Sequence, residues 1–145
     1  MARISNIDWD KDIYAKGKQL NNWPFTEVIS DILEAKKKSE MPQPKILEIG
    51  CGACNNLWFA AEAGLDIYGM DMSATAIDYG KKHLEKRGIH NHNLKVGDIT
   101  KLDWEDSYFD IVLDRGALTQ NNYERISKCL DETSRILKPN GVMLS

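Results

Sequence analysis

Short apolar segments alternate with helical patterns from residue 45 to the end of the chain. The expected strands are 46–49, 67–70, 94–96, 109–113 and 142–144. The longer segments between them favour helices at 56–63, 74–87 and 123–137. Strands that alternate with helices form parallel sheets through right-handed crossovers, which place helices against the sheet. The alternation therefore predicts an α/β domain built on one parallel sheet.

The first 44 residues follow a different pattern. Residues 8–22 are polar with scattered aromatic side chains and show no sustained period. Pro24 then opens an amphipathic helix that continues to Lys38, and Pro42 and Pro44 mark a linker before the first strand. We expect residues 1–44 to form an N-terminal part with one helix, residues 45–145 to form the core, and the two to make one compact domain.

Composition excludes several classes of protein. The chain has 145 residues, of which 42% are hydrophobic and 28% charged, as in soluble globular domains. Nineteen basic and 22 acidic side chains give a net charge of −3, so nucleic acid is not expected as a partner. The longest apolar run, 57–61, is far below the ~18 residues of a membrane span, and residues 1–10 have no apolar signal core.

Three cysteines, an odd number, occur in a chain without a signal sequence. We therefore expect reduced thiols, a cytoplasmic location and no contact with membranes.

The segment 48–56, Glu-Ile-Gly-Cys-Gly-Ala-Cys-Asn-Asn, lies between an expected strand and an expected helix. Gly50 and Gly52 allow a tight turn and close approach of a ligand to the backbone, and the following helix presents free N–H groups. Asp71 comes 19 residues after Gly52, at the end of the next strand, where a carboxylate can bind ribose hydroxyls. Together these features predict a nucleoside-binding site at the carboxyl ends of the strands.

Five motifs in this order resemble those of the class I S-adenosylmethionine (SAM)-dependent methyltransferases, small-molecule type. They are 46–52 (Ile-Leu-Glu-Ile-Gly-Cys-Gly), 69–73 (Gly-Met-Asp-Met-Ser), 96–99 (Val-Gly-Asp-Ile), 109–113 (Phe-Asp-Ile-Val-Leu) and 135–141 (Arg-Ile-Leu-Lys-Pro-Asn-Gly). The resemblance implies a Rossmann-like three-layer sandwich with strand order 3-2-1-4-5, helices on both faces and an N-terminal helical lid. It also implies methyl transfer from SAM to a small-molecule acceptor.

The resemblance assigns the methionine and ribose parts of SAM to the first two motifs. The backbone at Gly50, Cys51 and Gly52 would hold the methionine moiety. Glu48 would orient this loop and lie within reach of the amino group of SAM, and Asp71 would bind the ribose of SAM.

Adenine and the acceptor are assigned to later positions. Met72 would cover one adenine face, and Asp98 with the backbone of Ile99 would bind the adenine edge. Asp114 and Arg115 would face the sulfonium and the acceptor, while residues 14–23 would form part of a lid. Asp98 and Asp114 are expected to bind rather than to act as bases, because methyl transfer depends mainly on positioning. No residue is assigned a catalytic role.

Two departures from the family pattern affect these expectations. Position 54, often a third glycine, is Cys54, which would narrow the approach to the loop. The chain also stops at the fifth strand, where family members continue with two more strands and a helix. We therefore expect either a fragment of a longer enzyme or a fifth strand covered by a second copy in a homodimer. A non-catalytic SAM-binding domain is the corresponding alternative function.

Three other interpretations are weaker. Cys51-Gly52-Ala53-Cys54 has the spacing of thioredoxin-like redox sites, but Glu48-Ile49-Gly50 before it matches a nucleotide-binding loop. A nicotinamide-dependent oxidoreductase would need its third glycine at position 55, which is Asn55. His90 and His92 lie in one loop with no further ligand nearby in sequence, so no metal site is expected.

His83 and the basic residues of the same helix, up to Arg87, are expected on a solvated helix face. Trp9, Trp23 and Trp104, all in expected loops, are candidates for covering a ligand.

Overall fold

The computed structural model describes residues 7–145 and contains one parallel five-stranded sheet of order β3-β2-β1-β4-β5. The strands are β1 (Lys45–Ile49), β2 (Asp66–Asp71), β3 (Asn93–Val96), β4 (Phe109–Asp114) and β5 (Leu137–Leu144). The helices are α1 (Thr26–Lys38), α2 (Asn55–Glu62), α3 (Ala74–Lys86) and α4 (Tyr123–Ile136). Short helical turns occur at η1 (Trp9–Ile13), η2 (Tyr14–Lys16) and η3 (Leu118–Gln120). The predicted fold class and strand order are confirmed.

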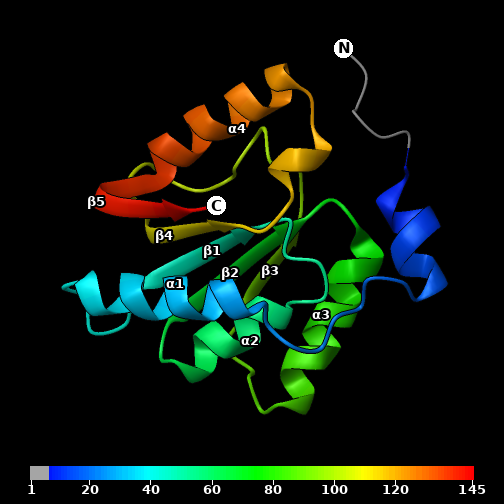
Figure 1. The fold of residues 1–145 in the computed structure, drawn as a ribbon, viewed down its shortest axis with the longest axis horizontal. Coiled ribbons are helices and arrows are strands. Elements are labelled where there is room, and N and C mark those ends of the chain that lie inside the picture. Colours follow the sequence, from blue (N-terminus) through cyan, green and yellow to red (C-terminus); the bar gives the residue numbers. More distant parts are fainter. Residues whose placement is uncertain (1–6) are drawn as a thin grey trace.

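Helices cover both faces of the sheet, as Figure 1 shows. Helices α1, α2 and α3 pack on one face, where Ile32, Leu57 and Leu84 bury their side chains against alternate residues of the strands. Helix α4 packs on the other face through Cys129 and Ile136. The central strands β1 and β4 are apolar on both sides, as expected for a parallel sheet covered twice.

The strand β5 differs from its predicted form. The fifth strand was expected at 142–144, but β5 begins at Leu137 and contains Pro139-Asn140-Gly141. Its register against β4 shifts between Phe109 and Ile111, and Asn140 has a φ of +67°. The segment is therefore a bulge within the strand, stabilised by pairing with β4 that a sequence pattern does not reveal.

β5 lies at one edge of the sheet, beside β4 alone among the described strands. Val142 on it is 38% exposed, so this strand is only partly covered. Pairing of two copies at this edge stays a prediction.

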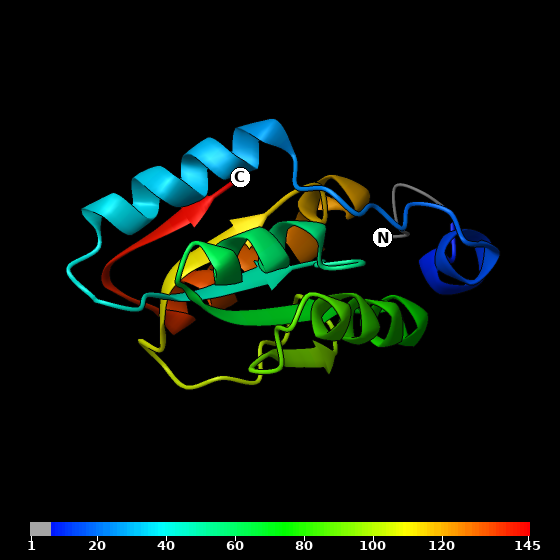
Figure 2. The same ribbon diagram turned by 90° about the horizontal axis from the view of Figure 1, so that it is seen from below.

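The N-terminal segment folds back toward the carboxyl ends of the strands. Figure 2 shows η1 and η2 beyond one end of the sheet, next to α3. The expectation that the N-terminus has no signal core falls partly on residues 1–6, which lie outside the described residues. Within residues 7–145, no helix is long and apolar enough to span a bilayer.

Candidate cofactor-binding site

A cavity of about 350 Å³ lies at the carboxyl ends of the central strands. Its floor comes from the loops after β1, β2, β3 and β4, and its remaining wall from the N-terminal segment and the first turn of α4. Of the predicted cofactor residues, those lining it are Glu48, Gly50, Cys51, Gly52, Asp71, Met72, Asp98, Ile99 and Arg115. The structure therefore brings together residues from three of the five motifs with Arg115, which follows a fourth.

The loop after β1 needs glycine at two positions. Gly50 and Gly52 have φ values of +68° and +52°, in the left-handed region that glycine adopts without strain. A Cβ on Gly50 would lie 2.5 Å from the Cβ of Ala117, and one on Gly52 would lie 3.0 Å from Tyr14 Oη. Side chains here would displace the turn after β4 or the N-terminal segment that borders the cavity.

Cys54 does not narrow the approach to the loop as expected. It adopts a left-handed conformation, with φ +63°, and its buried side chain is absent from the cavity wall. The thiol instead points at α3, where a Cβ on Gly80 would lie 2.6 Å from Cys54 Sγ. Gly80 thus leaves the space that the cysteine requires.

Glu48 is a buried carboxyl with one free oxygen. Its Oε1 accepts a 2.7 Å hydrogen bond from Asn56 Nδ2, whereas its Oε2 has no partner among the described residues. Burial raises the pKa of Glu48 to about 8, against the effect of the Asn56 bond, and the charges of Asp114 and Asp71 add to the rise. A buried, unpartnered oxygen in the wall of a cavity points to a ligand group that forms a hydrogen bond with it.

Asp71 ties β2 to the glycine loop. Its Oδ2 accepts from the Gly52 backbone N–H at 2.9 Å, and its Oδ1 accepts from the Ser73 N–H at 2.9 Å. Burial raises the pKa of this carboxyl, and the backbone hydrogen bonds oppose the rise. The Met72 N–H also bonds to this carboxylate, so three of its four acceptor positions are used and one remains for a ribose hydroxyl.

Asp98 forms an ion pair with Arg125 that the sequence did not predict. Its Oδ1 accepts from Thr100 and, at 2.8 Å, from Arg125 Nη2 on α4. Burial acts to raise the pKa of Asp98, but these bonds and the Arg125 charge hold it below its usual value. No bond to Oδ2 occurs in the described part of the chain, which leaves this oxygen available for an adenine amino group.

Asp114 does not reach the cavity. It is buried, and its Oδ1 accepts from the backbone N–H groups of Ala117 at 2.8 Å and Leu118 at 3.3 Å. The expectation that it faces the acceptor is not met, because the carboxylate turns back to cap the loop that follows β4. Only Arg115 of this pair lines the cavity.

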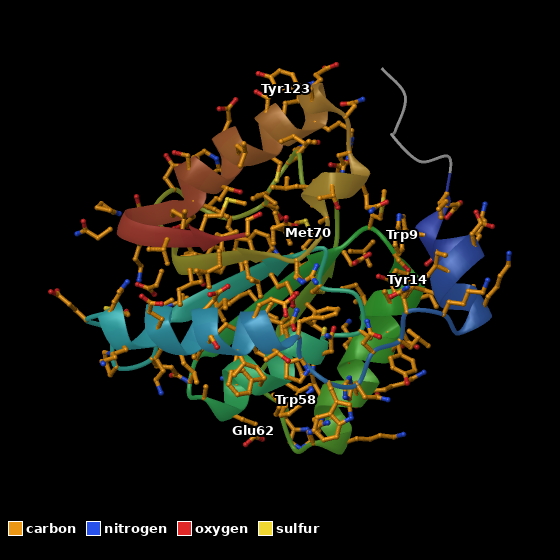
Figure 3. All side chains as sticks on the ribbon, in the orientation of Figure 1. Trp9, Tyr14, Trp58, Glu62, Met70 and Tyr123 are labelled. Carbon is orange, nitrogen blue, oxygen red and sulfur yellow. The ribbon has the colours of Figure 1, made fainter. Side chains whose placement is uncertain are left out.

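The N-terminal segment borders the cavity through Trp9 and Tyr14, which Figure 3 shows beside the carboxyl ends of the strands. Asp10 Oδ1 accepts from Ser73 Oγ at 2.5 Å and from the Thr75 N–H at 3.0 Å, which fastens the segment to the start of α3. Trp23 and Trp104 lie elsewhere: Trp23 packs against Trp58, and Trp104 packs against the core. Only Trp9 of the three predicted tryptophans contributes to the site.

His83 is not on a solvated face, contrary to expectation. It is buried, and its Nδ1 lies 3.0 Å from the carbonyl oxygen of Ala53, to which it can only donate. Its Nε2 accepts from Arg87, whose guanidinium stacks 3.8 Å from the Trp58 ring centroid. His83 therefore anchors the glycine loop to α3, which sequence alone did not reveal because the partner is a backbone carbonyl in another motif.

The cysteine pair lacks the electrostatics of a redox site. Cys51 Sγ and Cys54 Sγ lie 3.9 Å apart, both buried. The hydrogen bond between the two thiols, and then burial, raise the pKa of Cys51 well above its ordinary value. Redox-active thiols in this spacing have lowered pKa values instead.

Further lining residues were missed by sequence reasoning. They are amide side chains from the start of α2 and the loop before α4: Asn55, Asn56, Gln120 and Asn121. Gln19 and Asn21, which also line the cavity, belong to the predicted lid, residues 14–23. Asn56 could have been predicted from its position in the sequence, since it follows the glycine loop directly. The others lack a distinguishing pattern, because amides in loops are ordinarily solvent-exposed.

Comparisons with known proteins agree with this geometry. The model of a methyltransferase domain family matches residues 41–145. A protein of Rickettsia prowazekii is 36% identical over 100 residues, covering 68% of this chain and 40% of that protein. The eEF1A lysine and N-terminal methyltransferase of Mus musculus is 29% identical over 141 residues, covering 92% of this chain and 20% of its own length.

A solved structure shows the same architecture. The putative SAM-dependent methyltransferase from Methanococcus maripaludis superposes with a TM-score of 0.75 at 19% identity. The match covers 99% of this chain and 65% of that one.

The Rossmann-like sheet and the cavity at its strand ends define a nucleoside-cofactor domain. The chain belongs to the methyltransferase domain family, and the putative SAM-dependent methyltransferase described above shares its fold. It spans less than half the length of the two curated relatives described above.

The residues present fit the family cofactor. Glu48 Oε2 is a buried oxygen without a partner among the described residues, and an ammonium group bound beside it would favour the ionised carboxylate. The glycine loop allows close approach of the ligand, and Asp71 and Asp98 lie at the ends of consecutive strands. The individual roles assigned to these residues remain predictions.

Proposed function

We propose that this chain transfers a methyl group from SAM to a small-molecule acceptor. The observation that supports a small acceptor best is the N-terminal segment, which borders the cavity with Trp9, Tyr14, Gln19 and Asn21. A segment that covers the strand ends favours a molecule that enters the cavity over a folded macromolecule that docks on it.

The residues of the site would bind different parts of SAM. Glu48, the glycine loop and Asp71 would hold the methionine and ribose parts of SAM, and Met72, Asp98 and Ile99 would hold adenine. SAM, when bound, supplies a methyl group on a positively charged sulfur, which is already activated for transfer. The chain then contributes mainly by placing the acceptor in line with that methyl group and by limiting access of water. No residue of the site is required as a base.

A protein acceptor is the second candidate function. The mouse relative is named as a lysine and N-terminal methyltransferase, and the match to it covers 92% of this chain. A lysine side chain could enter the same cavity if the N-terminal segment moved aside. A third alternative is SAM binding without turnover.

Methyl-labelled SAM separates these alternatives. The chain is incubated with the dialysable and the non-dialysable fraction of a cell extract, and labelled products are quantified in each. We expect label in dialysable molecules. Label confined to proteins would replace the small-molecule proposal, and SAM binding without labelled product in either fraction would favour the non-catalytic alternative.

We also propose that the chain acts without nucleic acid or a membrane, in the cytoplasm. The net charge of −3 supports the absence of a nucleic-acid partner. Addition of tRNA to the labelling reaction tests this point: label recovered in the RNA would contradict it.

A further inference from the structure

The turn after β4 is packed against the glycine loop, which places Arg115 next to the cofactor side of the cavity. Gly50 and Ala117 are so close that a Cβ on the glycine would lie 2.5 Å from the alanine Cβ. Asp114 fixes the same turn by accepting from the N–H groups of Ala117 and Leu118. Arg115, between these anchored residues, lines the cavity.

The guanidinium of Arg115 is positioned without using most of its donors. It stacks 4.4 Å from the centroid of the Phe25 ring, and Nη2 donates to Glu27 Oε1 at 2.9 Å. The Phe25 backbone is held in turn, since its N–H donates to Asn56 Oδ1 at 3.1 Å. A ring holds the planar cation in place but accepts none of its in-plane N–H groups, and within residues 7–145 those groups make no other hydrogen bond.

The ion pair between Arg115 and Glu27 is weak enough for another anion to replace Glu27. The two side chains are 41% and 60% exposed, and exposed ion pairs of this kind contribute only about 0–1 kcal/mol. Glu27 lies outside the cavity wall. A second oxyanion arriving from inside the cavity could therefore take up the unused N–H groups or replace Glu27.

The other charges of the wall are arranged differently. Asp98 pairs with Arg125, Asp71 accepts from backbone N–H groups, and Glu48 is bonded to Asn56. Arg115 is thus the lining cation without a carboxylate partner in the wall. Its lining neighbours in the same loop are uncharged: Gly116, Ala117, Thr119 and Gln120.

We propose that Arg115 binds an oxyanion of the methyl acceptor, a carboxylate or a phosphate, with Phe25 as the platform that holds the guanidinium flat. The acceptor would then be an anionic small molecule, anchored beside the position of the methyl group. This inference rests on the proposed methyl transfer and specifies its substrate class.

The test uses acetate and inorganic phosphate as probes, because they present the two oxyanions alone. Each is titrated into the chain saturated with S-adenosylhomocysteine, with chloride added to keep ionic strength constant. The Arg115 Nε–H signal is followed by ¹⁵N NMR and assigned by its absence in Arg115→Gln. We expect saturable shifts with at least one probe, and the stronger probe identifies the anion.

Variants distinguish a specific site from general charge. Because Arg115→Gln lacks the Nε–H signal, binding to all variants is followed by the backbone N–H signals of the loop after β4. Arg115→Gln should weaken the binding of that probe by about tenfold or more, the loss typical of a charge-assisted hydrogen bond. Phe25→Leu keeps the charge but removes the platform, and should weaken binding several-fold. Glu27→Gln should strengthen binding, since it removes the competing carboxylate. Lys128→Gln, which removes an exposed cation on α4, should leave it unchanged.

Two outcomes would overturn the inference: no saturable shift with either probe, or binding that survives in both Arg115→Gln and Phe25→Leu, each with a wild-type melting temperature. Calorimetry with S-adenosylhomocysteine on the same wild-type sample is independent of these results. If the nucleoside fails to bind, the proposed function fails; if it binds and the anions do not, only the oxyanion inference fails.

Discussion

At the scale of single residues, Cys54 and Gly80 form a matched pair. Cys54 lies at a φ of +63°, a position that glycine fills at lower cost, and its thiol occupies the space above Gly80 of α3. A glycine within a helix costs stability relative to alanine, so its presence here has a packing reason. The departure from the family glycine at position 54 is therefore compensated in a different element.

Gly80→Ala should destabilise the chain by about 1–3 kcal/mol, because the new methyl group would overlap Cys54 Sγ. In the Cys54→Gly background the overlap disappears, and the same change should be neutral or stabilising by about 1 kcal/mol through helix propensity. Chemical denaturation of the four proteins measures the coupling. Equal costs in both backgrounds would contradict the packing argument.

Glu48 makes stability depend on pH in the direction opposite to most carboxyl groups. The folded chain keeps the Glu48 proton up to a pKa of about 8, while the unfolded chain releases it near the ordinary value of 4.5. The folded state thus binds more protons across this interval, and the free energy of unfolding falls as pH rises through it. Above about pH 8 the contribution of the Glu48 proton to the free energy of unfolding is fully lost.

Glu48→Gln removes this contribution. We expect the stability difference between Glu48→Gln and wild type to change by roughly 3–5 kcal/mol in favour of the variant from about pH 4.5 to about pH 9. Urea unfolding across that range measures it, and the other titrating groups cancel in the comparison. Parallel pH profiles would show that Glu48 ionises normally.

The thiols of Cys51 and Cys54 should be reduced and unreactive in the folded chain. Both are buried, and the raised pKa of Cys51 leaves little thiolate at neutral pH. Thiol titration should show slow modification under native conditions and rapid modification in denaturant. A reversible disulfide at cytosolic redox potentials would support a redox role instead.

At the scale of elements, the sequence predicted the helices and strands well, because their periodicities are set by burial against a two-sided sheet. Each predicted strand before β5 ends within one residue of its observed end. The errors concern side chains and segments whose partners lie in other elements. Asp114 caps its own loop, His83 bonds to Ala53, and β5 contains a bulge paired with β4. None of these partners is visible in a local pattern.

The position of the N-terminal segment depends on its contacts with α3. Asp10 provides two of them, to Ser73 Oγ and to the Thr75 N–H of α3. Asp10→Ala should therefore loosen the segment, with faster proteolysis near residues 9–20 and a several-fold faster release of bound SAM. Stopped-flow displacement measures the release. Asp78→Ala, on the exposed face of α3, is the matched control, and equal rates in both variants would contradict the tethering role.

At the scale of the whole molecule, the strand order 3-2-1-4-5 brings motifs from distant parts of the sequence together at the carboxyl ends of the strands. Parallel strands with right-handed crossovers place all their carboxyl ends together, which explains why strand-end residues could be selected from sequence. The part of the cavity wall that Asn121 and Arg125 form could not be predicted, since it depends on how α4 and the loop before it pack beside those ends.

The central claim is that this cavity binds SAM, and titration calorimetry of the folded chain with SAM and with NADH tests it most directly. We predict one SAM bound per chain and no NADH. Asp71→Ala should weaken SAM binding by about 2–3 kcal/mol, or roughly 30–150-fold. Gly52→Val should abolish binding with the fold retained, because its φ of +52° and the nearby Tyr14 Oη exclude a branched side chain. Tighter binding of NADH, or wild-type SAM affinity in both variants, would contradict the account.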